Sequence, residues 1–327
     1  MSKGYKFLYM NDILKKLGDI GLVPVVKIDD VSRACGLAQA LIDGGLPCAE
    51  ITFRTAAAAD AISAITKKFP EMLVGASTVI NVDYAKRAKE AGAKFIVAPG
   101  FSPDVVDWCI ANNMPVVPGI NNPSGVEAGL AKGLEVLKFF PAEASGGVAM
   151  LSALSGPFPQ VKFMPTGGVG MKNLSDYAKC ANIHAIGGSW MVKADLIEAE
   201  NWQEITRLCK EAVVALHGFE LAHIGINAEN AEEAMQAAKL FALFGFPLKD
   251  GNSSIFNASC IEIMKGKGRG KNGHIAIRCW NIERALAYLA QFGFKGVEET
   301  AKYKKDKLSM IYLDKEICGF AVHLVKA

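Results

Sequence analysis

The sequence predicts an α/β protein, a (β/α)8 TIM barrel followed by an α+β domain of paired βαβββ modules. Eight short apolar runs alternate with amphipathic segments between residue 22 and about residue 216. From residue 220 the pattern changes to a weak internal repeat. The 327 residues also suit two domains, since one domain usually holds roughly 100–200 residues. We place these domains at residues 1–217 and 218–327.

The eight apolar runs have the length and composition of buried strands. They read LVPVVKI, CAEITF, MLVGAST, FIVAPG, PVVPGI, VLKFFP, VKFMPTGG and AIGGSWM. Segments between them, such as SRACGLAQALIDGG and DYAKRAKEAGA, carry apolar residues at helical spacing and glycine near their ends. Strands that alternate with helices predict a parallel sheet, and eight of them in about 200 residues match a closed barrel. An open, doubly wound sheet is the alternative.

The second domain is predicted from two similar halves. The first half runs from ELAHIGIN through a helical segment and three short strand-like runs to SCIEIM. The second half runs from GHIAIRCW through the same series to GFAVHLV. His223 and His274 occupy equivalent places in the two halves. Such repetition indicates two copies of one supersecondary unit packed together.

Composition excludes several classes of protein. The net charge of +3 is too small for a nucleic-acid binder, and the basic run Lys265–Lys271 is typical of a solvated linker. No apolar stretch approaches the ~20 residues of a membrane span, and the N-terminus lacks the pattern of a secretory signal. The eight cysteines are scattered without a CxxC pair. We therefore expect a soluble cytoplasmic protein with no nucleic-acid or membrane partner.

A lysine within an apolar strand is the clearest chemical signal in the barrel. Strand side chains alternate between two faces, so Glu50 and Arg54 share one face of CAEITFR. In VLKFF, Lys138 shares a face with Val136 and Phe140. If both faces point inward, the three side chains converge near the C-terminal mouth, where barrel active sites lie. Lys138 could then form a Schiff base with a carbonyl, Glu50 could move protons, and Arg54 could hold a carboxylate.

A structural explanation of these residues remains open beside the chemical one. Glu50 and Lys138 could be a buried ion pair without a catalytic role. Lys27, at the end of the first strand, is a second candidate nucleophile. Lys162 begins its strand, so we expect it at the opposite, non-catalytic end of the barrel.

Two glycine pairs predict a phosphate site. TGG at residues 166–168 follows the seventh run, and GGS at residues 187–189 lies in the eighth. Barrel phosphate sites form from the loops after strands seven and eight, where glycine lets backbone N–H groups approach the anion closely. The alternative is a pair of tight strand–helix turns.

Several motifs carry a resemblance to a known family. GGLPCAEITFRT, GASTV, FIVAPG, PVVPGI, LKFFPAE, GPFPQVKFMPTGG and IGGSWMV resemble the class I aldolases of 2-keto-3-deoxy-6-phosphogluconate (KDPG) and 4-hydroxy-2-oxoglutarate (KHG). The similarity covers nearly all of residues 12–216. It implies a homotrimeric barrel that cleaves KDPG to pyruvate and glyceraldehyde 3-phosphate without a cofactor. The galactonate epimer and KHG are the alternative substrates.

The same resemblance implies roles for individual residues. Lys138 matches the Schiff-base lysine, and Glu50 matches the general acid/base. The substrate-binding positions, from the pyruvoyl part toward the phosphate, are Arg54, Thr78, Pro99, Phe140, Thr166, Gly167, Gly168, Gly188 and Ser189. Ser77 stands where the family often has glycine, and INNPSG stands where ISTxSE is common, so the aldehyde product stays open.

The paired βαβββ modules resemble the vicinal-oxygen-chelate superfamily, which includes glyoxalase I and bleomycin-resistance proteins. In that fold the first and last strands of each module can each supply one metal ligand. The matching positions here are His223, Glu262, His274 and His323, the last where many members have glutamate. Imidazole and carboxylate suit a divalent ion that acts as a Lewis acid. The domain would then be a metal-dependent isomerase or lyase. Without a metal, these histidines are core residues, and the domain senses a ligand or mediates oligomerisation.

Overall fold

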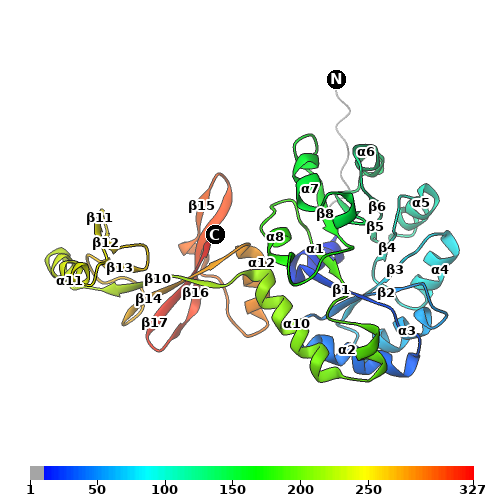
Figure 1. Ribbon diagram of the computed structural model, residues 1–327, viewed down its shortest axis with the longest axis horizontal. Helices are drawn as coiled ribbons and strands as arrows, with labels where there is room; N and C mark the ends of the chain where they lie inside the picture. The colour runs from blue at the N-terminus through cyan, green and yellow to red at the C-terminus, as the bar shows by residue number, and fades with distance from the viewer. Residues whose placement is uncertain (1–10) are drawn as a thin grey trace. The chain divides into compact units, whose positions relative to one another are not determined.

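The computed structural model describes residues 11–327, which form two compact units. The chain passes from the first unit to the second between Leu216 and His217. The first ten residues, part of the segment predicted to lack a secretory signal, lie outside the described range. Figure 1 shows that helices surround the strands of the first unit, whereas the second unit is mostly sheet.

The strands of the first unit pair in parallel throughout the described range. A six-stranded sheet has the order β5-β4-β3-β2-β1-β9, and a three-stranded sheet has the order β6-β7-β8. This unit is therefore an α/β fold with a parallel-strand half-barrel. Its strands are β1 Leu22–Val26, β2 Cys48–Thr52, β3 Leu73–Ser77, β4 Ile96–Val97, β5 Val116–Val117, β6 Gly119–Ile120, β7 Val136–Phe139, β8 Lys162–Pro165 and β9 Ile186–Gly188.

The helices of the first unit connect and cover these strands (Figure 1). Asparagine begins three of them, because the side chains of Asn11, Asn81 and Asn122 each accept a hydrogen bond from the backbone N–H three residues later. Such caps satisfy a donor that the helix itself leaves free. The helices are α1 Asp12–Ile20, η1 Val31–Arg33, α2 Ala34–Asp43, α3 Ala58–Lys68, α4 Val82–Glu90, α5 Pro103–Ala111, α6 Pro123–Ala131, η2 Glu143–Ser145, α7 Gly147–Ser155, α8 Leu174–Ala178, α9 Ala194–Glu198 and α10 Trp202–His217.

The fifth apolar run, predicted as one strand, forms two. β5 ends at Val117 and β6 begins at Gly119, and the two strands belong to different sheets. Pro118 lies between them, and proline has no N–H with which to continue a ladder. Its carbonyl oxygen accepts a hydrogen bond from the N–H of Lys138 at 2.9 Å. The break between the sheets therefore lies directly beside the strand that carries the lysine.

Along the strands, the interior of the first unit has an apolar layer and then, nearer the carboxyl ends of the strands, a polar layer. The apolar layer consists of Leu17, Val23, Cys48, Leu73, Phe95, Val97, Val117, Val136, Met164 and Ala185. Several of its strands carry a polar residue two positions further along, as in Cys48 followed by Glu50 and Val136 followed by Lys138. Because residues i and i+2 of a strand share a face, these polar side chains enter the same interior nearer the carboxyl ends of the strands.

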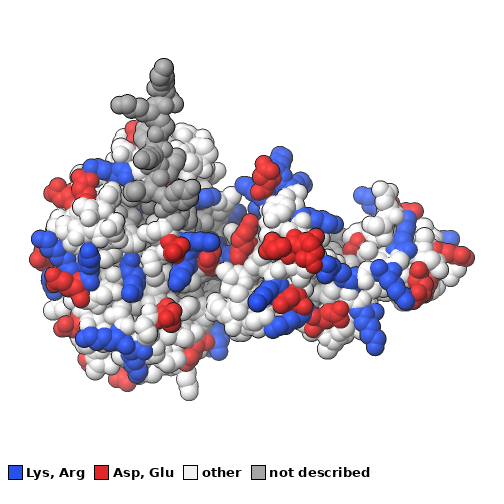
Figure 2. All heavy atoms as spheres, turned by 180° about the vertical axis from the view of Figure 1, so that it is seen from behind, with Lys and Arg blue, Asp and Glu red and all other residues white. Residues whose placement is uncertain are grey.

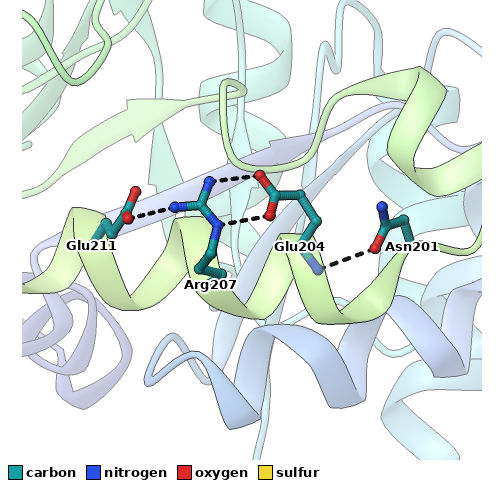
Figure 3. Close-up of polar contacts among 4 residues, drawn as sticks. All are labelled: Asn201, Glu204, Arg207 and Glu211. Atoms are coloured by element: carbon teal, nitrogen blue, oxygen red, sulfur yellow. Dashed lines mark hydrogen bonds and ion pairs between the residues drawn. The ribbon is translucent and has the colours of Figure 1, made fainter.

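Helix α10 carries a network of ion pairs on its exposed side. Arg207 donates to both carboxylate oxygens of Glu204, at 2.7 and 2.6 Å, and also to Glu211 one turn later. At the helix start, Asn201 accepts a hydrogen bond from the N–H of Glu204 (Figure 3). Ion pairs on an exposed helix face stabilise a helix only weakly, because water screens the charges. The buried face of α10, which includes Ile205, therefore contributes most to holding the helix in place.

The second unit is an eight-stranded sheet made of two βαβββ modules, so the predicted repeat is present in the structure. The sheet order is β11-β12-β13-β10-β14-β17-β16-β15, and β10 and β14 pair antiparallel where the modules join. The first module contains β10 Glu220–Asn227, α11 Ala231–Leu243, β11 Leu248–Asp250, β12 Ser254–Asn257 and β13 Ile261–Met264. The second contains β14 Gly273–Cys279, α12 Ile282–Ala290, η3 Glu298–Thr300, β15 Lys302–Lys304, β16 Lys307–Ile317 and β17 Phe320–Lys326.

Charged side chains of both signs are interspersed over the face drawn in Figure 2. This mixture agrees with the small net charge of +3. Within residues 11–327, no helix combines the length and the apolar character that crossing a membrane requires.

Gly75 tests how tightly the interior of the first unit is packed. A Cβ at this position would lie 2.4 Å from the ring of Phe95, which is fully buried. We expect Gly75→Ala to lower the free energy of unfolding by about 1–3 kcal/mol, because the ring must shift within a filled interior. Gly100→Ala, where nothing lies within 4 Å of the added Cβ, is the control. Urea denaturation of the full chain measures both variants, and equal stabilities would contradict the packing described.

Candidate active site

Lys138 and Glu50 form a buried ion pair inside the first unit. Lys138 Nζ lies 3.3 Å from Glu50 Oε1, and the two side chains are 6% and 0% exposed. β7 carries the lysine and β2 the glutamate, each two positions beyond the apolar layer. The structure thus brings together the two residues for which the sequence predicts catalytic roles. Removing two charges from water is costly, so a pair in this position calls for a functional reason.

Several buried oxygen atoms in the same interior have no hydrogen-bond partner among the described residues. They are Glu50 Oε2, Thr52 Oγ1, Ser77 Oγ and Thr166 Oγ1. Buried polar atoms are normally hydrogen-bonded, so an unpaired group of them marks a place where a ligand or water completes the bonding. Sequence reasoning did not identify Thr52 as a site residue, although it shares a strand face with Glu50. It noted Ser77 only as a departure from the family pattern.

The ring of Phe140 lies beside both the lysine and the turn that follows β8. Lys138 Nζ is 5.3 Å from the centre of this ring. A Cβ on Gly167 would lie 3.3 Å from the same ring, and Gly167 has a φ of +98°. Glycine adopts this backbone conformation far more readily than other residues do. Phe140 therefore lies between the lysine and the turn predicted to bind phosphate.

The glycine pair of β9 allows close approach of two side chains. A Cβ on Gly187 would lie 2.3 Å from Thr166 Oγ1, and a Cβ on Gly188 would lie 1.8 Å from the ring of Trp190. Thr166 and Gly187 also form a parallel bridge. These glycines therefore have a packing role whether or not an anion binds nearby.

Pro99 and Thr78 lie just beyond the carboxyl ends of β4 and β3. Gly119, the register partner of Lys138, faces Pro99 so closely that a Cβ would lie 2.1 Å from the Pro99 carbonyl oxygen. Thr78 has a φ of +58°, an uncommon backbone conformation for threonine. Both predicted residues therefore lie at the carboxyl ends of the strands, the end nearer to Lys138 and Glu50.

Arg54, Gly168 and Ser189 line one pocket of about 520 Å³. Each follows the carboxyl end of its strand, β2, β8 and β9 respectively. Lys27 and Lys193 line the same pocket, and sequence reasoning did not predict Lys193. Three cationic side chains and the glycine turn give this pocket the character of an anion site.

The alternative lysines do not share the buried site. The ammonium of Lys27 pairs with Asp29 at 2.7 Å, and the Lys27 side chain is 47% exposed. Lys162 is the first residue of β8, and its ammonium bonds to the carbonyl oxygen of Ala181. Lys162 thus lies at the opposite end of the strand from the predicted site, as its place in the sequence predicts.

A family model for KDPG and KHG aldolases matches residues 12–208 of the chain. The chain belongs to the KDPG and KHG aldolase family. The first unit, which contains the matched region and which we call the aldolase unit, is therefore a carbon–carbon lyase. The match ends at residue 208 and so does not extend into the second unit.

Relatives and solved structures agree with this assignment. The chain is 46% identical over 201 residues to a 2-dehydro-3-deoxy-phosphogluconate aldolase of Haemophilus influenzae, covering 62% of this chain and 95% of the relative. It is 44% identical over 192 residues to the KHG/KDPG aldolase of Escherichia coli, covering 59% of this chain and 90% of the relative.

A KDPG aldolase structure from Legionella pneumophila, with pyruvate captured as a covalent carbinolamine, has a TM-score of 0.61 and 37% identity. That match covers 62% of this chain and 99% of the Legionella chain. The aldolase of Zymomonas mobilis with 3-phosphoglycerate has a TM-score of 0.57 and 39% identity, covering 62% of this chain and 96% of its own.

The second unit has a separate cluster of titratable side chains. His223 Nε2, His274 Nε2 and Glu262 Oε2 lie 3.1 Å from one another. A ligand nitrogen of His323 lies within 4.8 Å of those of the other two histidines. Ser254 donates a 2.6 Å hydrogen bond to the other oxygen of Glu262. The structure thus brings together all four residues for which the sequence predicts a metal site.

His323 has unused bonding capacity within this cluster. It is 6% exposed, and neither ring nitrogen has a hydrogen-bond partner within the described residues. Burial, with smaller contributions from neighbouring positive groups, lowers the pKa of His323 to about 3, so the ring is neutral at physiological pH. Burial alone would raise the pKa of Glu262, but hydrogen bonds from His223, His274 and Ser254 hold it below its ordinary value. A neutral imidazole beside an ionised carboxylate is the form that binds metal ions.

The buried pair of the aldolase unit can be tested through stability. Lys138→Met leaves the Glu50 charge buried without its partner, so we expect the free energy of unfolding to fall by about 3–5 kcal/mol. The double variant Lys138→Met/Glu50→Gln removes both charges and should lose less. Denaturant unfolding of the full chain measures both. If the double variant were as unstable as the single variant, the loss would come from packing rather than from the unpaired charge.

Proposed function

We propose that the aldolase unit, residues 1–217, is a Schiff-base enzyme that cleaves KDPG to pyruvate and glyceraldehyde 3-phosphate. The buried pair of Lys138 and Glu50, 3.3 Å apart, is the observation that carries the mechanism. The names of the Haemophilus and Escherichia relatives support the substrate. The carbinolamine in the Legionella aldolase supports attack by an amine on a ketone. The reaction needs no cofactor.

The geometry supports the following sequence of steps. Lys138 Nζ attacks the C2 carbonyl carbon, and loss of water from the carbinolamine gives an imine. Glu50, or a water that it holds, takes the proton of the C4 hydroxyl. The C3–C4 bond then breaks, its electrons pass to the imine to form an enamine, and glyceraldehyde 3-phosphate leaves. Protonation of the enamine carbon and hydrolysis of the imine release pyruvate and restore the lysine.

Substrate binding is assigned to the residues around the pair. Arg54 holds the carboxylate of the pyruvoyl part by paired hydrogen bonds, beside Thr78. The other proposed contacts are Pro99, Phe140, Thr166, Gly167, Gly168, Gly188 and Ser189, the last five toward the phosphate. The pocket that joins Arg54 to Gly168 and Ser189 supports a substrate with an anion at each end. The Zymomonas structure with 3-phosphoglycerate supports a phosphorylated one.

The finer architecture and the alternative substrates also belong to this proposal. We propose that the strands close into a full eight-membered TIM barrel. The isolated bridges Phe163–Ile183 and Thr166–Gly187, which pair β8 and the residue after it with β9 and the segment before it, support this closure. A homotrimer and a cytoplasmic location rest on the family resemblance and on composition. The galactonate epimer and KHG remain the alternatives, because C4 stereochemistry depends on contacts with the bound sugar acid.

Borohydride trapping tests the imine directly. Incubation of the full chain with pyruvate and sodium borohydride should leave a reduced pyruvyl adduct on the peptide that contains Lys138, detected by mass mapping. Lys138→Ala should abolish the adduct, and Lys27→Ala should leave it unchanged. An adduct on Lys27 would mean that the nucleophile is misassigned. The absence of any adduct on folded protein would refute the Schiff-base mechanism.

A second function is proposed for residues 218–327, as a vicinal-oxygen-chelate-like domain that binds a divalent metal ion through His223, Glu262, His274 and His323. Ligand atoms about 2.0–2.2 Å from one tetrahedral metal ion lie about 3.3–3.6 Å apart. The 3.1 Å spacings of this cluster are only slightly shorter, so small side-chain shifts would bring these atoms to ligand distance. The unpaired nitrogens of buried His323 support a fourth ligand there. When bound, the ion would supply a Lewis acid for an isomerase or lyase reaction. A ligand-sensing or oligomerising module is the alternative.

Metal binding can be measured without knowing the reaction. We expect Zn²⁺ to bind the metal-stripped full chain at one site in titration calorimetry and to raise the temperature at which the second unit unfolds. His323→Ala should weaken binding by roughly 10–100-fold. His217→Phe, which changes a buried histidine that stacks on Phe219 outside the cluster, is the matched control. Equal Zn²⁺ affinity in the His323→Ala variant would contradict the proposed ligand set.

A further inference from the structure

The turn that follows β8 is in contact with the chain that follows β7. We call residues 166–170 the glycine turn. The N–H of Glu143 donates a 3.1 Å hydrogen bond to the carbonyl oxygen of Gly167. The Glu143 side chain lies so close to Gly168 that a Cβ there would be 2.6 Å from Glu143 Cγ. Glu143 therefore holds the glycine turn through both its backbone and its side chain.

Asn173, which precedes helix α8, holds the same turn from the other side. Its side-chain Nδ2 donates to the carbonyl oxygen of Gly168 at 3.2 Å, and its Oδ1 accepts from the N–H of Gly170 at 2.8 Å. Gly167 and Gly168 both have positive φ, +98° and +81°. Glycine has wide backbone freedom, so contacts outside the turn are needed to keep it in one shape.

Tyr177 connects helix α8 to Glu143. The tyrosine is fully buried, and its hydroxyl donates a hydrogen bond to Glu143 Oε1. Burial, and then this hydrogen bond, raise the pKa of Tyr177 far above its ordinary value, so the hydroxyl keeps the proton that it donates. Gly147 leaves room for the pair, because a Cβ there would lie 3.2 Å from the Tyr177 hydroxyl oxygen. One hydroxyl group thus fixes the side chain that packs against Gly168.

These contacts use the acceptors of the glycine turn and leave donors free. The carbonyl oxygens of Gly167 and Gly168 are occupied by Glu143 and Asn173. The N–H groups of Gly168 and Val169 have no acceptor among residues 11–327, and both residues line the pocket of about 520 Å³. Successive free N–H groups in a turn of this kind favour an anion.

We propose that Glu143, Asn173 and Tyr177 are positioning residues that hold the glycine turn in the shape that binds the substrate phosphate. We call these three residues the turn clamp. This inference rests on the function proposed above. A turn that is already ordered loses less conformational freedom when the anion binds, so the clamp increases affinity for a phosphorylated substrate. The clamp acts through the turn and takes no part in the chemistry at Lys138.

Tyr177→Phe tests the clamp, because it removes one hydroxyl and keeps the ring in the core. We expect the KM for KDPG to rise roughly three- to tenfold, the scale of one hydrogen bond, with little change in kcat. Exchange of the methyl protons of pyruvate with D₂O, followed by NMR, requires the imine but no phosphate and should keep its rate. Tyr84→Phe is the matched control, since the Tyr84 hydroxyl makes no hydrogen bond within the described part of the chain.

Two substitutions of Glu143 separate the hydrogen bond from the charge. Glu143→Ala should raise the KM for KDPG as Tyr177→Phe does. Glu143→Gln keeps an oxygen that can accept from Tyr177 and should stay close to the wild type. Asn173→Ala, which frees the carbonyl oxygen of Gly168 and the N–H of Gly170, should raise the KM in the same direction.

The possible results separate the turn clamp from the aldolase reaction. A wild-type chain that does not exchange pyruvate protons would overturn the proposed mechanism, and exchange without KDPG cleavage would overturn the proposed substrate; either result removes the basis of the clamp. An unchanged KM in both Tyr177→Phe and Glu143→Ala would overturn the clamp while the mechanism stands. Equal loss of cleavage and exchange in Tyr177→Phe would mean that the hydroxyl supports the whole site rather than the phosphate turn. An equal rise in KM for Glu143→Gln and Glu143→Ala would overturn the role of the hydrogen bond.

Discussion

The architecture of the aldolase unit depends on holding one pair of opposite charges inside a mainly apolar set of strands. Glu50 lies on β2 of the six-stranded sheet, whereas Lys138 lies on β7 of the three-stranded sheet. Their 3.3 Å contact therefore joins the two sheets. Two buried charges tolerate little change in separation, because each charge is expensive without the other. Both sheets must keep register for the pair to exist, and the apolar layer next to it maintains that register.

The two units place reactive groups in a similar way although their sheets differ. In the first unit the polar groups lie further along the same strand faces that carry the apolar layer. In the second unit they occupy the strand positions that alternate with the apolar ones. In each unit some of those polar atoms stay unpaired, as Glu50 Oε2 does in the first and the His323 nitrogens do in the second. An unpaired buried atom is unfavourable for folding alone. Its retention is understandable where a ligand completes its bonding.

The sequence predicted the elements better than their connections. Alternation of apolar runs located the strands, and the position of Lys138 within one of them identified the buried pair. The internal repeat also placed His223 and His274 in equivalent strands. The break at Pro118 was missed, because the run PVVPGI looks continuous by hydropathy. Thr52 and Lys193 were missed for a different reason: a threonine or lysine near a strand end is common, and only the folded pocket distinguishes these two.

The break at Pro118 also has a consequence for motion. β5 and β6 are two residues each, so few backbone hydrogen bonds hold this seam, and segments with few such bonds open most easily in local fluctuations. The amide of Lys138 bonds to the carbonyl of Pro118 across the same seam. Transient opening would therefore shift the backbone beneath the lysine before any core strand unfolds. Amide hydrogen exchange along the chain would report this as early loss of protection around residue 138, ahead of β2 and β3.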